Sequence, residues 1–126
     1  MSGWQILGVA LGGGVGSGLR FVIACVIQRF AGTGFPLGTA VVNLAGCFCF
    51  GLIFSLSQGI WPLSRQARLV LLSGVMGGLT TFSTFIFETT TLISQGQILQ
   101  GCISLLVQLL GGAAFFGCGL LLGRGV

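Results

Sequence analysis

The side chains that could carry chemistry in this sequence are few, and most of them lie within long apolar segments. Glu88 is the only acidic residue, histidine is absent, and the five basic residues are all arginine. Acid–base and nucleophilic catalysis need a paired acid, an imidazole or an activated nucleophile beside a base. These residues supply no such set, so the sequence does not predict an enzyme.

Neither the cysteines nor the arginines form a recognisable binding site. The five cysteines all lie in apolar runs, none belongs to a CxxC pair, and no histidine is present to complete a zinc set. We therefore expect them to be small buried apolar residues. The arginines are scattered along the chain, at positions 20, 29, 65, 68 and 124. This distribution excludes a nucleic-acid-binding surface, which needs basic residues clustered on one face.

Three polar side chains are stranded in apolar runs, where polar groups are costly and are functional candidates by default. Asn43 follows Thr39 by one turn on the same helical face. Its amide either joins two helices or offers N–H donors to an anion in a polar path. Arg20 either extends toward the membrane surface or lines an aqueous vestibule that collects anions. Glu88 either acts in transport, as a proton carrier does in an antiporter, or simply faces water.

Residues 74–88, GVMGGLTTFSTFIFE, interrupt a long apolar run with poor helix formers. Gly77, Gly78, Thr80 and Thr81 predict a break in the helix near Gly77–Thr80. Non-helical backbone at membrane depth is tolerated only where it is buried in protein or lines a cavity. Carbonyl groups freed at such a break are ready cation ligands. The alternative is a continuous helix whose glycine pair packs closely against a neighbour.

Two phenylalanines follow the expected break. Phe82 and Phe85 are three residues apart and therefore share a helical face. On spacing alone, such a pair usually faces lipid or the protein core. An aromatic ring also has a positive edge, so ring edges that point into a pore would offer an anion a weakly polar site.

The elements that must position these side chains are spanning helices. Hydrophobic residues make up 54% of the 126 residues, charged residues 5%, and the mean hydropathy is +1.10, whereas soluble domains carry about 25% charged residues. Apolar stretches long enough to span a bilayer occur at about 4–29, 37–57, 67–94 and 98–122. The first is too long for a signal peptide and lacks its basic flank. We expect an all-α integral membrane protein whose residues 1–126 form a single four-helix domain.

Charge and glycine content predict how these helices insert and associate. One end of the bundle receives Arg65, Arg68 and Arg124 and the other only Arg29, a weak bias under the positive-inside rule that permits insertion in both directions. Glycine accounts for 24 residues, many at small-xxx-small spacings that let helices approach closely in lipid. Four helices alone enclose little, so both features favour an oligomer, such as an antiparallel homodimer.

At the level of motifs, the chain resembles the CrcB/Fluc family of fluoride channels. The resemblance rests on GG-x-TTFSTF at residues 77–85, PLGT-xxx-NLxG at residues 36–46, and a glycine-rich first span that contains Arg20. It covers the whole chain in the right order. It implies an antiparallel dual-topology homodimer with two fluoride pathways, in the bacterial cytoplasmic (inner) membrane, with fluoride, sodium, the lipid bilayer and a second copy of the chain as partners and no nucleic acid.

The resemblance also assigns roles to individual residues. The pore residues would be Asn43, Phe82, Phe85, Thr39, Thr84 and Glu88, with Arg20 in the vestibule. Carbonyl groups of Gly77 and Thr80, from both subunits, would hold a central structural sodium ion. The family usually places a tyrosine or histidine on the fourth helix, and this chain contains neither residue. Ser104 is the expected occupant, with Gln108 one turn on.

The predicted function is therefore passive, fluoride-selective export that lowers the fluoride concentration in the cytoplasm. A pore of this kind must replace tightly held water with several modest donors and still release the ion. One alternative is a small four-helix dual-topology drug/proton antiporter, which needs a carboxylate deep in the first span, where residues 4–29 contain none. The other is a non-transporting membrane packing subunit, for which the glycines suffice.

Overall fold

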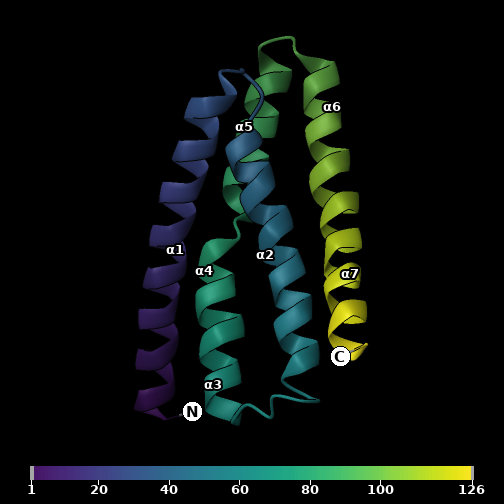
Figure 1. Ribbon diagram of the computed structural model, residues 1–126. Coiled ribbons are helices and arrows are strands. Elements are labelled where there is room, and N and C mark those ends of the chain that lie inside the picture. Colours follow the sequence, from purple (N-terminus) through teal and green to yellow (C-terminus); the bar gives the residue numbers. More distant parts are fainter. Residues whose placement is uncertain (1, 126) are drawn as a thin grey trace.

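Four long apolar rods make up the computed structural model, which describes residues 2–125 (Figure 1). The first rod is α1 (Gly3–Ala31) and the second is α2 (Leu37–Leu56). The third consists of α3 (Arg65–Leu69), the π-helical η1 (Val70–Met76), α4 (Gly77–Leu79) and α5 (Phe82–Ser94). The fourth consists of α6 (Ile98–Leu106), the π-helical η2 (Val107–Gly111) and α7 (Gly112–Arg124). All four rods are long and apolar enough to cross a membrane, which confirms the expected all-α class with four candidate spans.

The rods run up and down, so that the connections alternate between the two ends of the bundle. The described N-terminal end, the α2–α3 connection and the C-terminal end of α7 lie at one end, and the other two connections lie opposite (Figure 1). At the opposite end Gly32 closes α1 in a left-handed conformation, with φ of 59°, which glycine adopts without steric cost. The Gln28 side chain holds the turn that follows, because its amide donates to the carbonyls of Thr33 (2.8 Å) and Phe35 (3.0 Å) and accepts from the backbone N–H of Gly38 (3.1 Å).

Two helix pairs form the closest packing, and glycine makes both possible. Along its length α2 packs on α7, and α1 packs on η1 and α4. A Cβ at Gly119 would overlap the backbone carbonyl of Phe48, and one at Gly16 would overlap that of Val75. Side chains at these positions would therefore force the helices apart, which confirms that glycine mediates close helix contacts within the chain.

The third rod breaks at the end of the predicted interval Gly77–Thr80 and one residue beyond it. Gly77 and Gly78 remain helical, and the extended residues are Thr80 (φ −83°, ψ 152°) and Thr81 (φ −145°, ψ 115°). The prediction that the glycine pair itself opens the helix is wrong. A Cβ at Gly78 would overlap the carbonyl of Gly13, so this glycine serves close packing against α1. The break falls on the two β-branched threonines, whose backbone favours extended conformations.

Candidate ion-conduction site

The break in the third rod is held by the side chain of Asn43 on α2. The amide oxygen Oδ1 of Asn43 accepts from the backbone N–H of Thr81 (2.8 Å), and Nδ2 donates to the Thr81 carbonyl (3.0 Å). In an uninterrupted helix that N–H would instead donate to the carbonyl of Gly77. Asn43 therefore replaces part of the missing helical hydrogen bonding, as membrane-embedded backbone requires.

Beyond the break, Thr81 starts α5 as an N-cap. Its Oγ1 accepts from the backbone N–H of Thr84 (3.3 Å) and donates to the Thr84 hydroxyl (3.0 Å). Side-chain oxygens at this position satisfy N–H groups that have no partner inside the helix. Thr84, one of the expected pore residues, thus lies directly beside the break with its hydroxyl engaged by Thr81.

Asn43 also connects the break to the fourth rod. Its Nδ2 donates to Oε1 of Gln108 (2.7 Å), and Nε2 of Gln108 donates to the hydroxyl of Ser104 (3.3 Å). The Ser104 hydroxyl lies 2.8 Å from that of Thr89 on α5. Ser104, Gln108 and Thr89 are all buried. A continuous line of hydrogen bonds therefore runs through the apolar interior from Thr81 to Thr89.

This arrangement shows which residue of the fourth rod meets the amide of Asn43. We expected Ser104 as the fourth-helix residue of the polar track, with Gln108 one turn on, and this role stays a prediction. In the structure Gln108 contacts Asn43 directly, and Ser104 accepts a hydrogen bond from Gln108. Gln108 lies in η2, and π-helical segments are rare and occur frequently at functional sites. A lone glutamine within an apolar run was the sequence signal for this residue. The interhelical role of Asn43 is thus established, and its role toward an ion stays a prediction.

A small cavity of about 180 Å³ lies beside this hydrogen-bonded line. Asn43 and Gln108 supply its amides and Phe82 and Phe85 its rings; the full lining is Asn43, Cys47, Thr80, Thr81, Phe82, Phe85, Gln108 and Leu109. The two ring centroids are 5.6 Å apart with an interplanar angle of 66°, an edge-on arrangement. Phe85 is 2% exposed, whereas Phe82 is 67% exposed. The two rings therefore touch each other, and only Phe82 projects from the surface of the chain.

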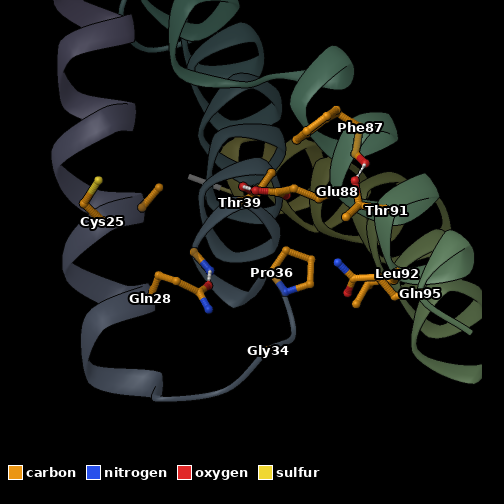
Figure 2. Close-up of a pocket in the computed structure, with 12 residues that line it drawn as sticks. Cys25, Gln28, Gly34, Pro36, Thr39, Phe87, Glu88, Thr91, Leu92 and Gln95 are labelled. Carbon is orange, nitrogen blue, oxygen red and sulfur yellow. Dashed lines mark hydrogen bonds between the residues drawn. The ribbon is translucent and has the colours of Figure 1, made fainter. Parts of the chain in front are cut away.

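A second, larger pocket of about 430 Å³ lies near the end of the bundle that carries the α1–α2 turn. Thr39 and Glu88 point toward one another there (Figure 2), and the Thr39 hydroxyl donates to Oε1 of Glu88 (2.8 Å). The other oxygen, Oε2, is buried and has no hydrogen-bond partner among the described residues. Glu88 is therefore a partly enclosed carboxyl group that lines a pocket, and it does not simply face water.

The Arg20 side chain on α1 contacts the backbone just before the break. Nε of Arg20 donates to the carbonyl of Gly78 (3.2 Å), which also accepts from the Ser17 hydroxyl (3.4 Å). This carbonyl would bond the N–H of residue 82 in a continuous helix. The guanidinium group therefore folds back onto the break from α1 instead of extending fully toward the membrane surface.

The two carbonyl groups expected to hold a cation have lost their helical partners. The N–H of Thr81, the helical partner of the Gly77 carbonyl, donates to Asn43, and the N–H of Thr84, the helical partner of the Thr80 carbonyl, donates to the Thr81 hydroxyl. Backbone carbonyls at unwound segments are suitable ligands for sodium. The residues present fit such an ion, but one chain supplies too few oxygens to surround it. Within residues 2–125 no cluster of three His, Cys, Asp or Glu side chains could hold a metal.

The family model described as CrcB-like protein, Camphor Resistance (CrcB), matches residues 7–120. The chain belongs to the CrcB family. Every residue of the break, the hydrogen-bonded line and both pockets named above lies within the matched range, as far as Leu109.

Curated relatives of this CrcB chain carry a common name. It is 42% identical over 120 residues, 95% of each chain, to the fluoride-specific ion channel FluC of Maridesulfovibrio salexigens. It is 45% identical over 107 residues to the protein of the same name from Chlorobium phaeobacteroides, covering 85% of this chain and 83% of the relative. A third FluC, from Desulforapulum autotrophicum, is 39% identical over 116 residues, covering 92% and 93% respectively. The similarity thus extends over nearly the whole of both chains.

Proposed function

We propose that this protein is a fluoride-selective ion channel of the bacterial cytoplasmic membrane, which lets fluoride leave the cytoplasm down its electrochemical gradient. The observation that carries this proposal is the end-to-end similarity to three proteins named as fluoride-specific ion channels. Four candidate spans and the absence of any catalytic set in the sequence agree with a channel and not with an enzyme.

The path that we propose joins the two pockets. Fluoride holds its water tightly, so a selective pore must offer several modest donors in exchange. Thr39 and Glu88 line the larger pocket, which we call the outer pocket. Asn43, Phe82 and Phe85 line the smaller one, which we call the inner cavity. Thr84 and Ser104 extend the polar surface between and behind the two. Arg20 would raise the local anion concentration at the vestibule.

The functional unit in this proposal is an antiparallel homodimer. A single chain leaves Phe82 67% exposed and leaves Gly77 exposed beside the break. A second copy would cover Phe82 and close the inner cavity on its open side. It would also bring its own Gly77 and Thr80 carbonyls to a central sodium ion, which neutralises the partial negative charge of these oxygens and supplies positive potential near the anion path.

Efflux from liposomes tests the function directly. Proteoliposomes loaded with potassium fluoride or potassium chloride are treated with valinomycin, and an electrode follows the released anion. We expect fast fluoride efflux and almost no chloride efflux. Equal efflux of the two anions, or no fluoride efflux from correctly folded protein, contradicts the proposal.

Substitution of the rings tests the proposed path. Phe82→Ile and Phe85→Ile should abolish fluoride efflux, because isoleucine offers no positive ring edge, while gel filtration still shows an assembled protein. Phe30→Ile is the matched control, because Phe30 is 86% exposed near the end of α1 and touches neither pocket. Undiminished efflux in both ring variants refutes the role of the ring edges.

A further inference from the structure

The carboxamide of Gln108 is a buried polar group to which the proposed path assigns no task. It is 7% exposed, lies in a π-helical segment, and lines the inner cavity together with Asn43 and the two phenylalanine rings. Both of its ends are engaged, since Oε1 accepts from Asn43 Nδ2 (2.7 Å) and Nε2 donates to the Ser104 hydroxyl (3.3 Å).

In this arrangement the cavity is not prepared for an anion. Both N–H groups of Asn43 are used, one by the Thr81 carbonyl (3.0 Å) and one by Gln108 (2.7 Å). The Gln108 atom that meets Asn43 is an oxygen, which repels an anion. A negative ion can reach the Asn43 donor only if this oxygen gives way.

A carboxamide can do so by rotating and drawing back slightly, because it carries an acceptor on one side and two donors on the other. Rotation of the Gln108 amide by half a turn would place Nε2 where Oε1 lies now. N–H groups of Asn43 and Gln108 would then face each other, which is unfavourable unless an acceptor lies between them. A small anion is such an acceptor, and it would receive a hydrogen bond from each side once the two nitrogen atoms lie farther apart than the 2.7 Å that now separates Asn43 Nδ2 from Gln108 Oε1.

The hydrogen bonds on the Ser104 side of Gln108 also permit this rotation. After it, Oε1 would face Ser104 and would need a donor there. The hydroxyl of Ser104 lies 2.8 Å from that of Thr89, and either oxygen can be the donor in that pair. Thr89 can therefore donate to Ser104 while Ser104 donates to Gln108. Reversal of two hydroxyl protons keeps the number of hydrogen bonds on this side of Gln108 unchanged, so only the Asn43 side loses a bond, and the anion replaces it.

We propose that Gln108 is an acceptor-to-donor switch: its oxygen closes the Asn43 site when no ion is present, and its rotated N–H binds the anion together with Asn43. The Ser104–Thr89 pair is the proton-reversible support of this switch. The identity of the anion as fluoride rests on the proposed function, whereas the switch itself follows from the hydrogen bonds around Gln108.

Two substitutions separate the switch from simpler roles. Gln108→Glu keeps the shape and the acceptor for Asn43 but removes the donor, and Gln108→Met keeps the length but removes both. Each should lower fluoride efflux by about tenfold or more, the value of one hydrogen bond to a charged group. Gln66→Glu is the matched control on the exposed part of α3. Wild-type efflux in Gln108→Glu would mean that Gln108 only holds Asn43 in place, and faster efflux in Gln108→Met would mean that it is only a plug; either result overturns the switch.

Side-chain NMR of the wild-type protein provides a second test that does not depend on flux. With ¹⁵N in the glutamine amides, the Gln108 NH₂ signal should shift on titration with potassium fluoride and not with potassium chloride. The signal is assigned by its loss in Gln108→Met. No fluoride-dependent shift overturns the switch. If wild-type efflux were absent but the signal moved, the switch would stand and the channel function would fall.

Discussion

At the residue scale, the interior of this chain is governed by the need to pair every polar atom that lies at membrane depth. Asn43 uses both N–H groups and its oxygen, and Ser104 is buried between two polar partners. Among residues 2–125 Glu88 is the exception, since only one of its oxygens is bonded there. A buried oxygen without a partner carries a desolvation cost. We therefore expect the Thr39 hydroxyl, which donates to the other oxygen, to contribute more to the free energy of unfolding than an ordinary surface hydroxyl.

Replacement of Thr39 measures this contribution. Thr39→Val keeps the shape of the side chain but removes the donor to Glu88, which leaves both carboxyl oxygens without a partner in the part of the chain that the structure describes. We expect a loss of about 1–3 kcal/mol in unfolding free energy, read from the SDS-induced unfolding midpoint in mixed micelles. Thr90→Val is the control, because the exposed Thr90 hydroxyl bonds only carbonyls of its own helix, at 2.9 and 3.0 Å. Equal shifts in the two variants would contradict the special role of Thr39.

At the element scale, glycine sets the distance between helices and threonine sets the position of the break. The α2 and α7 helices approach so closely that Gly51 meets the Phe116 carbonyl and Gly119 meets the Phe48 carbonyl. In lipid, where apolar burial gives no net drive for association, contacts of this kind supply much of the packing energy. The hydrogen bond between Asn43 and Gln108 depends on this spacing, because Asn43 lies on α2 and Gln108 on η2, which continues directly into α7.

A matched pair of glycines on α7 tests the packing. In Gly119→Ala the new Cβ meets the Phe48 backbone, whereas nothing lies within 4 Å of a Cβ at Gly117. We expect Gly119→Ala to destabilise the protein by about 1–3 kcal/mol through overpacking, and Gly117→Ala to be neutral or to stabilise it by up to about 1 kcal/mol through helix propensity. The unfolding midpoints of the two variants in mixed micelles test both expectations. A Gly119→Ala variant as stable as Gly117→Ala would show that α2 and α7 are not in close contact.

At the scale of the whole molecule, the chain has almost no charge with which to choose an orientation. Glu88 is the only acid and lies inside the bundle. The α3 helix, which holds Arg65 and Arg68, and the C-terminal end of α7, which holds Arg124, lie at one end of the bundle, and the last turn of α1, which holds Arg29, lies at the other (Figure 1). Orientation follows the difference in basic residues between the two sides of the membrane, and here that difference is small. Insertion in both directions is therefore what we propose.

Accessibility of a terminal tag tests this proposal. With an epitope fused after the last residue, intact spheroplasts and inverted membrane vesicles should each expose part of the tag population to a membrane-impermeant protease. Substitution of Arg65 and Arg68 by glutamine removes two of the three basic residues at that end and should shift the distribution. Cleavage from one side only in the unmodified protein would rule out dual topology.

The sequence by itself determined the class of the protein and the place of its irregular segment. Apolar runs of about 20 residues can satisfy their backbone in a bilayer only as helices, so composition and turn residues sufficed for four candidate spans. The low helix propensity of Gly77 to Thr81 located the interruption in this segment, although only Thr80 and Thr81 leave the helix. These are local properties, carried by residues close together along the chain.

Only the tertiary structure decided how the stranded polar groups pair. Asn43 and Gln108 are 65 residues apart, and Thr39 and Glu88 are 49 apart. Which groups meet depends on the rotation and depth of each helix, and these follow from glycine contacts and from the π-helical segments that alter the helical repeat. For the same reason the sequence alone does not tell which of Ser104 and Gln108 reaches the amide of Asn43, since their spacing of one turn places both on the same face.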